Sequence, residues 1–174
     1  MNSVWGSAAA AAIMLAVPAS ANDLFGGVYR HDLLLFTKDI HEGGADFEFG
    51  YRWNHLFTTG PIRGLQPYVV GSVNSRGGTD FAAAGLGYKI GHRLYIRPGL
   101  GIAIHDGPHR RYDSAGIRTD LGSRVVFEPE LALGFRVAPR IGVEASFTHL
   151  SHAQIFSQQN PGIDNLGVRV NLKL

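Results

Sequence analysis

Hydrophobic and polar positions alternate along most of this chain with a period of two. In the segment ADFEFGYRW, the aromatic residues Phe47, Phe49, Tyr51 and Trp53 share one parity, and charged residues take the other. The same alternation continues in RLYIRPGLGIAI, VVFEPELALGFRV and GVRVNLKL. Because successive side chains of a strand point to opposite faces, this period predicts β-strands with one apolar and one polar face.

The alternation places eight strands, near residues 24–35, 45–54, 65–74, 81–90, 93–104, 122–137, 141–151 and 164–174. Several of them have the length of about 9–11 residues that a tilted strand needs to cross a bilayer. Short connections at 91–92 and 138–140 alternate with longer polar ones at 75–80, 105–121 and 152–163. The pattern predicts an all-β fold, an eight-stranded antiparallel transmembrane β-barrel in the outer membrane of a Gram-negative bacterium. In such barrels the long loops lie outside the cell and the short turns in the periplasm.

A soluble β-sandwich or lipocalin-like barrel is the alternative, because it shows the same alternation with its apolar face turned inward. The charged residues on the polar parity separate the two folds. An eight-stranded membrane barrel has room inside for side chains but no pore, so these charges must neutralise one another there. We expect an internal ionic network of Arg97, Glu128, Glu130, Arg136, Glu144 and Arg169.

The N-terminal segment supports export from the cytoplasm. An apolar stretch at 8–17 is followed by the small-x-small sequence Ala19-Ser20-Ala21, which a signal peptidase recognises. The stretch is too short to cross a bilayer as a helix. We therefore expect a signal peptide at 1–21 and a single β-barrel domain at 22–174.

Composition and charge exclude several functions. The chain has 174 residues and a formal net charge of +2, too small and too scattered to favour nucleic acid as a partner. It has no cysteine, which rules out disulfides and thiolate zinc sites. His149 and His152 lie on opposite strand parities, so they do not form a metal pair, and we expect neither a metal nor another cofactor.

Three polar residues break the lipid-facing pattern near the C-terminus. Odd positions of 141–151 and even positions of 164–174 face lipid, which puts His149, Ser151 and Asp164 on one outer surface. Unsolvated polar groups are costly there. One explanation is a Ser–His–acid relay that attacks an ester. The alternative is an interfacial rim, in which these side chains contact only head groups and water.

At these residues the chain resembles the outer-membrane lipid A 3-O-deacylases called PagL. The resemblance rests on His149-Leu150-Ser151-His152-Ala153 and Asn160-Pro161-Gly162-Ile163-Asp164, with wider similarity at GGVYRHD, EGGADFEFGYRW and LGSRVVFEPELALGF. It implies an eight-stranded barrel that hydrolyses the ester-linked acyl chain at the 3-position of lipid A in lipopolysaccharide. Ser151 would then be the nucleophile, His149 the base and Asp164 the acid.

The chain departs from the family pattern at two positions. Better known members have Glu where Asp164 stands, and they have Asn after the nucleophile where this chain has His152. Asn160 and His152 are therefore candidates to stabilise the oxyanion or orient the site. The alternative role of Asn160 is to form the turn before Pro161.

Basic residues of the loop HDGPHRRYDSAGIR are candidates to bind the phosphates of lipid A, namely Arg110, Arg111 and Arg118. The alternative is a solvated loop. Two other functions stay open, namely a structural or adhesive barrel and an esterase or phospholipase acting on another lipid. The sequence also leaves a homodimer open.

Overall fold

The computed structural model describes residues 22–33, 35–36, 42–54, 57, 59–108, 118–156, 158 and 160–174. The expected signal peptide at 1–21 lies outside the described residues. The strands are β1 (Asp23–Arg30), β2 (Ala45–Arg52), β3 (Leu65–Asn74), β4 (Phe81–Tyr88), β5 (Ile90–Gly91), β6 (Leu94–His105), β7 (Val125–Ala138), β8 (Ile141–Leu150) and β9 (Ile163–Lys173).

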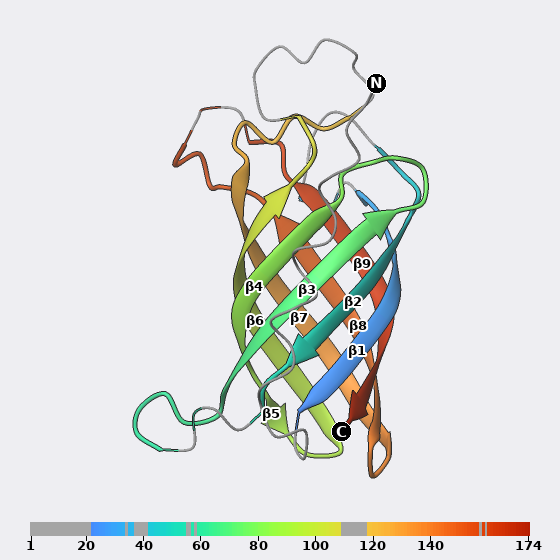
Figure 1. The fold of residues 1–174 in the computed structure, drawn as a ribbon, viewed down its shortest axis with the longest axis vertical. Helices are drawn as coiled ribbons and strands as arrows, with labels where there is room; N and C mark the ends of the chain where they lie inside the picture. The colour runs from blue at the N-terminus through green and yellow to red at the C-terminus, as the bar shows by residue number, and fades with distance from the viewer. Residues whose placement is uncertain are drawn as a thin grey trace, which may run out of the picture.

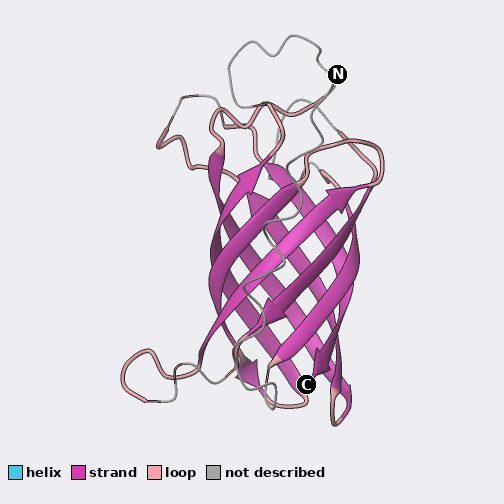
Figure 2. Ribbon diagram, in the orientation of Figure 1, coloured by secondary structure: helices cyan, strands magenta, loops and turns pink. Residues whose placement is uncertain are grey.

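The eight long strands form one closed antiparallel barrel (Figure 1). The first strand, β1, pairs with both β2 and the last strand, β9, and β4 pairs with β6. The two-residue β5 only extends the connection to β6. The strands cross the barrel obliquely and the described part of the chain contains strands and loops without a helix (Figure 2). The predicted fold is therefore confirmed.

The first strand is shorter than the sequence predicts, because it ends at Arg30 rather than near residue 35. Asp32 adopts a φ of 52°, a left-handed conformation that ends an extended strand. The Leu33 N–H then donates to the Asp164 carbonyl of β9 at 2.8 Å. This turn brings the backbone of Leu33 against the end of β9.

The outer surface of the barrel is apolar. The exposed large side chains include Phe47 and Phe49 of β2, Leu100 and Ile102 of β6, Leu131 and Leu133 of β7, and Val168 and Val170 of β9. A soluble barrel would bury this set, so the sandwich and lipocalin alternatives are wrong. No helix among the described residues is long and apolar enough to cross a membrane.

The barrel interior holds the predicted ionic network in part. Arg169 donates to both oxygens of Glu130 at 2.6 and 2.7 Å and to Glu144 at 2.5 Å. Arg97 also donates to Glu144, at 2.5 Å. Two expected members differ: Glu128 accepts a hydrogen bond from Tyr68 instead, and Arg136 is exposed at the mouth of the barrel. Arg136 lies two residues before the end of β7, where its side chain is exposed to solvent.

The two ends of the barrel differ. We call the end with the connections 31–44, 75–80, 106–124 and 151–162 the loop end. The other end, with the connections 53–64, 92–93 and 139–140, is the turn end. Residues Asn22 and Leu174 meet at the turn end, where the Leu174 N–H donates to the Asn22 carbonyl at 2.9 Å. That the loop end faces the cell exterior remains a prediction from the general orientation of such barrels.

Candidate active site

His149 and Asp164 form a hydrogen-bonded pair at the loop end. They are register partners on the adjacent strands β8 and β9. The His149 Nδ1 lies 2.6 Å from Asp164 Oδ1. The neighbours of His149 along β8, Thr148 and Leu150, are buried inside, so the imidazole is on the outer face, where 22% of it is exposed. His149 and Asp164 therefore share the outer face that strand alternation predicts for them.

Asp164 is fully buried although its parity faces outward. Phe36 covers it: the Phe36 N–H donates to Asp164 Oδ2 at 2.5 Å. The ring of Phe36 then packs edge-on against Phe147 of β8, with 5.8 Å between ring centroids. Each carboxylate oxygen of Asp164 thus has its own partner. The sequence did not reveal this cover, because the predicted first strand, 24–35, ran up to the residue before Phe36.

Ser151 lies just beyond β8 on the same outer face as His149. Its backbone pairs with Phe127 of β7: the Ser151 N–H donates to the Phe127 carbonyl at 3.1 Å, and the Phe127 N–H donates to the Ser151 carbonyl at 2.7 Å. Leu150 and His152, on either side of Ser151, are fully buried. The alternation therefore continues through Ser151, and its side chain shares a face with the His149–Asp164 pair.

The loop after Ser151 holds Asn160 against the site. The His152 N–H donates to Asn160 Oδ1 at 2.9 Å, which fixes the orientation of the amide, because a backbone N–H can only donate. The ring of His152 is buried on the opposite face and packs against Phe156, with 5.7 Å between centroids. Its imidazole thus points away from the face of Ser151, whereas the Asn160 amide nitrogen remains a donor.

Two strained residues follow directly. Ala153 and Gln154 have φ values of 51° and 60°, which are uncommon for residues other than glycine. The Ile155 N–H donates to the His152 carbonyl at 2.9 Å and closes this turn. The tight turn returns the chain toward Asn160 immediately after Ser151. No sequence signal such as glycine marked it.

The structure describes one of the three candidate phosphate-binding arginines, Arg118. Arg110 and Arg111 lie outside the described residues. Arg118 Nη2 donates to Asp106 Oδ1 at 2.6 Å and to the Gly78 carbonyl at 3.0 Å, so it joins two loops. Within the described ranges, no group of three or more His, Asp or Glu residues could hold a metal ion.

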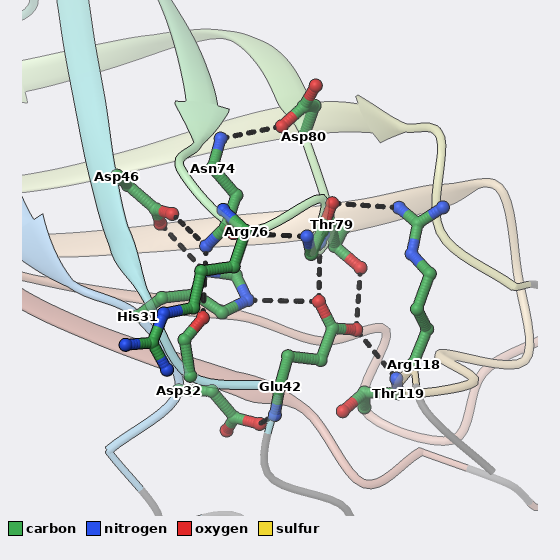
Figure 3. A network of polar contacts seen from close by, with 12 residues as sticks. His31, Asp32, Glu42, Asp46, Asn74, Arg76, Thr79, Asp80, Arg118 and Thr119 are labelled. Atoms are coloured by element: carbon green, nitrogen blue, oxygen red, sulfur yellow. Dashed lines mark hydrogen bonds and ion pairs between the residues drawn. The ribbon is translucent and has the colours of Figure 1, made fainter.

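A buried polar network that sequence reasoning missed closes the loop end (Figure 3). His31 contacts Asp46 at 2.7 Å through Nδ1 and Glu42 at 3.1 Å through Nε2. Glu42 also accepts hydrogen bonds from Thr79 and from the Thr119 N–H, the latter at 2.6 Å. Three loops therefore meet on one glutamate carboxylate.

The protonation states in this network follow from its contacts. Burial alone would lower the pKa of His31, but the hydrogen bonds to Asp46 and Glu42 outweigh it and raise the pKa to about 9. Burial opposes ionisation of Glu42, yet hydrogen bonds from His31, Thr119 and Thr79 hold its pKa below the ordinary value. At neutral pH the network therefore contains an imidazolium and a carboxylate.

An apolar exterior and an ionic interior define an outer-membrane β-barrel, and a hydrogen-bonded His–Asp pair lies on its outer surface. A family model described as lipid A 3-O-deacylase (PagL) matches residues 41–173. This range is most of the chain, and the chain therefore belongs to the PagL family. The protein hydrolyses the ester that links an acyl chain to the 3-position of lipid A, and it lies in the outer membrane of a Gram-negative bacterium.

Solved structures agree with this fold. The crystal structure of the outer membrane enzyme PagL matches with a TM-score of 0.60 and 19% identity, covering 87% of this chain and 99% of that one. A de novo designed transmembrane β-barrel matches with a TM-score of 0.53 and 11% identity, covering 91% and 98%. No curated protein matches the chain. The homodimer that the sequence left open gains no support from these matches.

Proposed function

We propose that this lipid A deacylase is a serine esterase in which Ser151 is the nucleophile, His149 the base and Asp164 the orienting acid. The observation that carries the proposal is the 2.6 Å contact between His149 Nδ1 and Asp164 Oδ1 on the outer surface of the barrel. Because Nδ1 is used by the carboxylate, Nε2 is the ring nitrogen left to accept the Ser151 proton. Ser151 follows on the same face.

The reaction would proceed in two halves. His149 Nε2 takes the hydroxyl proton while Ser151 Oγ attacks the ester carbonyl, and the tetrahedral intermediate expels the 3-oxygen of lipid A, which receives that proton. The acyl group is then bound to Ser151. A water molecule, deprotonated by His149, attacks this ester and releases the fatty acid. Asp164 stabilises the imidazolium in both halves.

The oxyanion would be stabilised by Asn160. Two backbone donors near the nucleophile are already used, because the Ser151 N–H donates to Phe127 and the His152 N–H donates to Asn160 Oδ1. The fixed amide leaves Asn160 Nδ2 as a donor for developing negative charge. Asn160→Ala should therefore lower the deacylation rate by about 100-fold or more, the usual effect of losing one oxyanion donor.

The position of the site suits a lipid substrate. Phe36, Phe147 and Leu166 give the surface around the His149–Asp164 pair an apolar character, so the acyl chain can lie along the barrel while its ester meets the polar pair. An outer-leaflet lipid would reach this site without entering the barrel. Arg110 and Arg111 remain candidates to bind the lipid A phosphates.

The proposal is tested by Ser151→Ala and His149→Ala. Each variant should lose release of the 3-linked acyl chain, because hydroxyl and imidazole act as one unit. Mass spectrometry of lipid A from cells that express each variant measures this loss directly. The matched control is Ser146→Ala, on β8 and facing the interior, and it should deacylate normally. Deacylation by Ser151→Ala at the wild-type rate would overturn the nucleophile assignment.

A further inference from the structure

A cationic pocket opens at the turn end of the barrel, among the ends of the strands and the β7–β8 turn. Its volume is about 270 Å³. Five cationic side chains line it, namely Lys89, Arg97, Arg136, Arg140 and Lys173. The acidic side chain in the lining is Asp23. This excess of positive charge contrasts with the chain as a whole, whose formal net charge is +2.

Most of these cations have no carboxylate partner. Arg97 pairs with Glu144 at 2.5 Å, but within the described part of the chain no carboxylate lies within 4.0 Å of Lys89, Arg136, Arg140 or Lys173. Lys89 instead lies 3.7 Å from the centroid of the Tyr95 ring, and the Arg97 guanidinium lies 5.2 Å from the same centroid. Like charges that share a partly enclosed cavity repel one another, and a bound anion would relieve this repulsion.

Buried donors in the lining are also unsatisfied. Arg97 Nε and Asn171 Nδ2 have no hydrogen-bond partner among the residues that the structure describes, although the two residues are only 2% and 5% exposed. Buried donors without an acceptor cost free energy, so native proteins rarely retain them without a reason. A ligand with several acceptor oxygens and negative charge would satisfy both the donors and the cations. Phosphate groups meet this description, because guanidinium and ammonium groups bind them through charge-assisted hydrogen bonds.

We propose that the turn-end pocket binds a phosphate-bearing anion. In the expected orientation this end faces the periplasm and the inner, phospholipid-containing leaflet of the membrane. A soluble phosphate compound and a phospholipid head group share the required chemistry. The pocket lies at the opposite end from Ser151, and the proposal is independent of the serine esterase mechanism.

Binding is tested with the barrel refolded in uncharged maltoside micelles. Isothermal titration with inorganic phosphate or glycerol 3-phosphate should show one saturable site on the wild type, weakened by added sodium chloride. The double variant Arg136→Gln/Lys173→Gln removes two exposed cations of the lining and should weaken this binding by at least about tenfold. Arg63→Gln is the matched control, because Arg63 is exposed at the same end outside the pocket. Heat-modified mobility on gels checks that each variant is folded.

A second arm separates the two sources of phosphate. Native mass spectrometry with added phosphatidylglycerol should retain one lipid on the wild type and none on the double variant if the source is a head group. If the wild type retains phosphatidylglycerol and added phosphate displaces it, the site binds a lipid head group. If phosphate binds in the isothermal titration but no lipid is retained, the site binds a soluble anion. Equal binding by wild type and double variant, or no binding in either arm, would overturn the proposal.

Discussion

Replacing Asp164 by asparagine should inactivate the enzyme through the wrong histidine tautomer. In the wild type, Asp164 Oδ2 accepts the Phe36 N–H at 2.5 Å and Oδ1 contacts His149 Nδ1 at 2.6 Å. A backbone N–H can only donate, so the asparagine oxygen must stay against Phe36, and its amide nitrogen must face His149. That nitrogen donates to Nδ1, which moves the ring proton to Nε2.

A histidine protonated at Nε2 cannot accept the Ser151 proton. The corresponding change in a serine protease triad lowers turnover by about 10⁴-fold, or about 5.4 kcal/mol of transition-state stabilisation. We expect a loss of this order for Asp164→Asn. Asp164→Glu, which keeps two acceptor oxygens, should retain part of the activity.

The assay is the initial rate of fatty acid release from purified lipopolysaccharide by the refolded barrel. Asp106→Asn makes the same chemical change at the loop end, on a side chain that is 57% exposed and pairs with Arg118, and it should keep the wild-type rate. If Asp164→Asn retained more than about a tenth of wild-type turnover, the carboxylate would not be setting the tautomer and the relay would be wrong.

Three further predictions concern stability and orientation. Arg169→Met should lower the free energy of unfolding by about 3–5 kcal/mol in urea titrations, because the carboxylates of Glu130 and Glu144 lose a buried partner. The stabilisation from protonated His31 should be complete below pH 6.5 and lost as pH rises through about 9, so protease cleavage of the loops should accelerate in alkali. An impermeant thiol reagent on intact cells should label Gln158→Cys and leave Pro139→Cys unlabelled.

Each of these three has a control and a contrary outcome. Lys173→Gln shares the inward parity of Arg169 but is exposed, and it should change stability by about 0.5 kcal/mol or less. A loss below about 1 kcal/mol for Arg169→Met would mean that the interior is solvated. His31→Ala should show loop cleavage that no longer depends on pH near 9, and unchanged dependence would remove His31 as its source. Labelling at Pro139→Cys alone would reverse the orientation.

The fold could be predicted because alternation encodes the environment of each side chain. The even positions of β9 from Leu166 to Leu172 face outward, as their apolar character predicts, and Arg169 between them lies in the interior network. The sequence failed where a single backbone angle ended the pattern: residues 33–36 are as apolar as a strand, but the left-handed φ of Asp32 ends the extended conformation before Leu33. Strand parity indicates which face of the sheet a side chain lies on, but not how far it lies from the end of the barrel. Arg136 was therefore predicted in the interior network, although it is exposed near the end of β7.

The site could be predicted only as far as parity reaches. His149, Ser151 and Asp164 share a face because strands alternate, and this required no knowledge of loops. The partners of Asp164 Oδ2 and of the His152 N–H come from segments far along the chain or beyond a strained turn. The His31–Glu42 network joins loops whose packing follows from no periodic pattern. Tertiary contacts between irregular segments are what the sequence alone left undetermined.

The cover over Asp164 has a consequence for biogenesis. The hydrogen bond from Phe36 to Asp164 joins positions 128 residues apart, across the seam where the first strand meets the last. The pairing of β1 with β9 forms only when the barrel closes. Before closure, Asp164 therefore lacks the hydrogen bond from Phe36. The Asp164 carboxylate would then gain its second hydrogen bond only when the barrel closes.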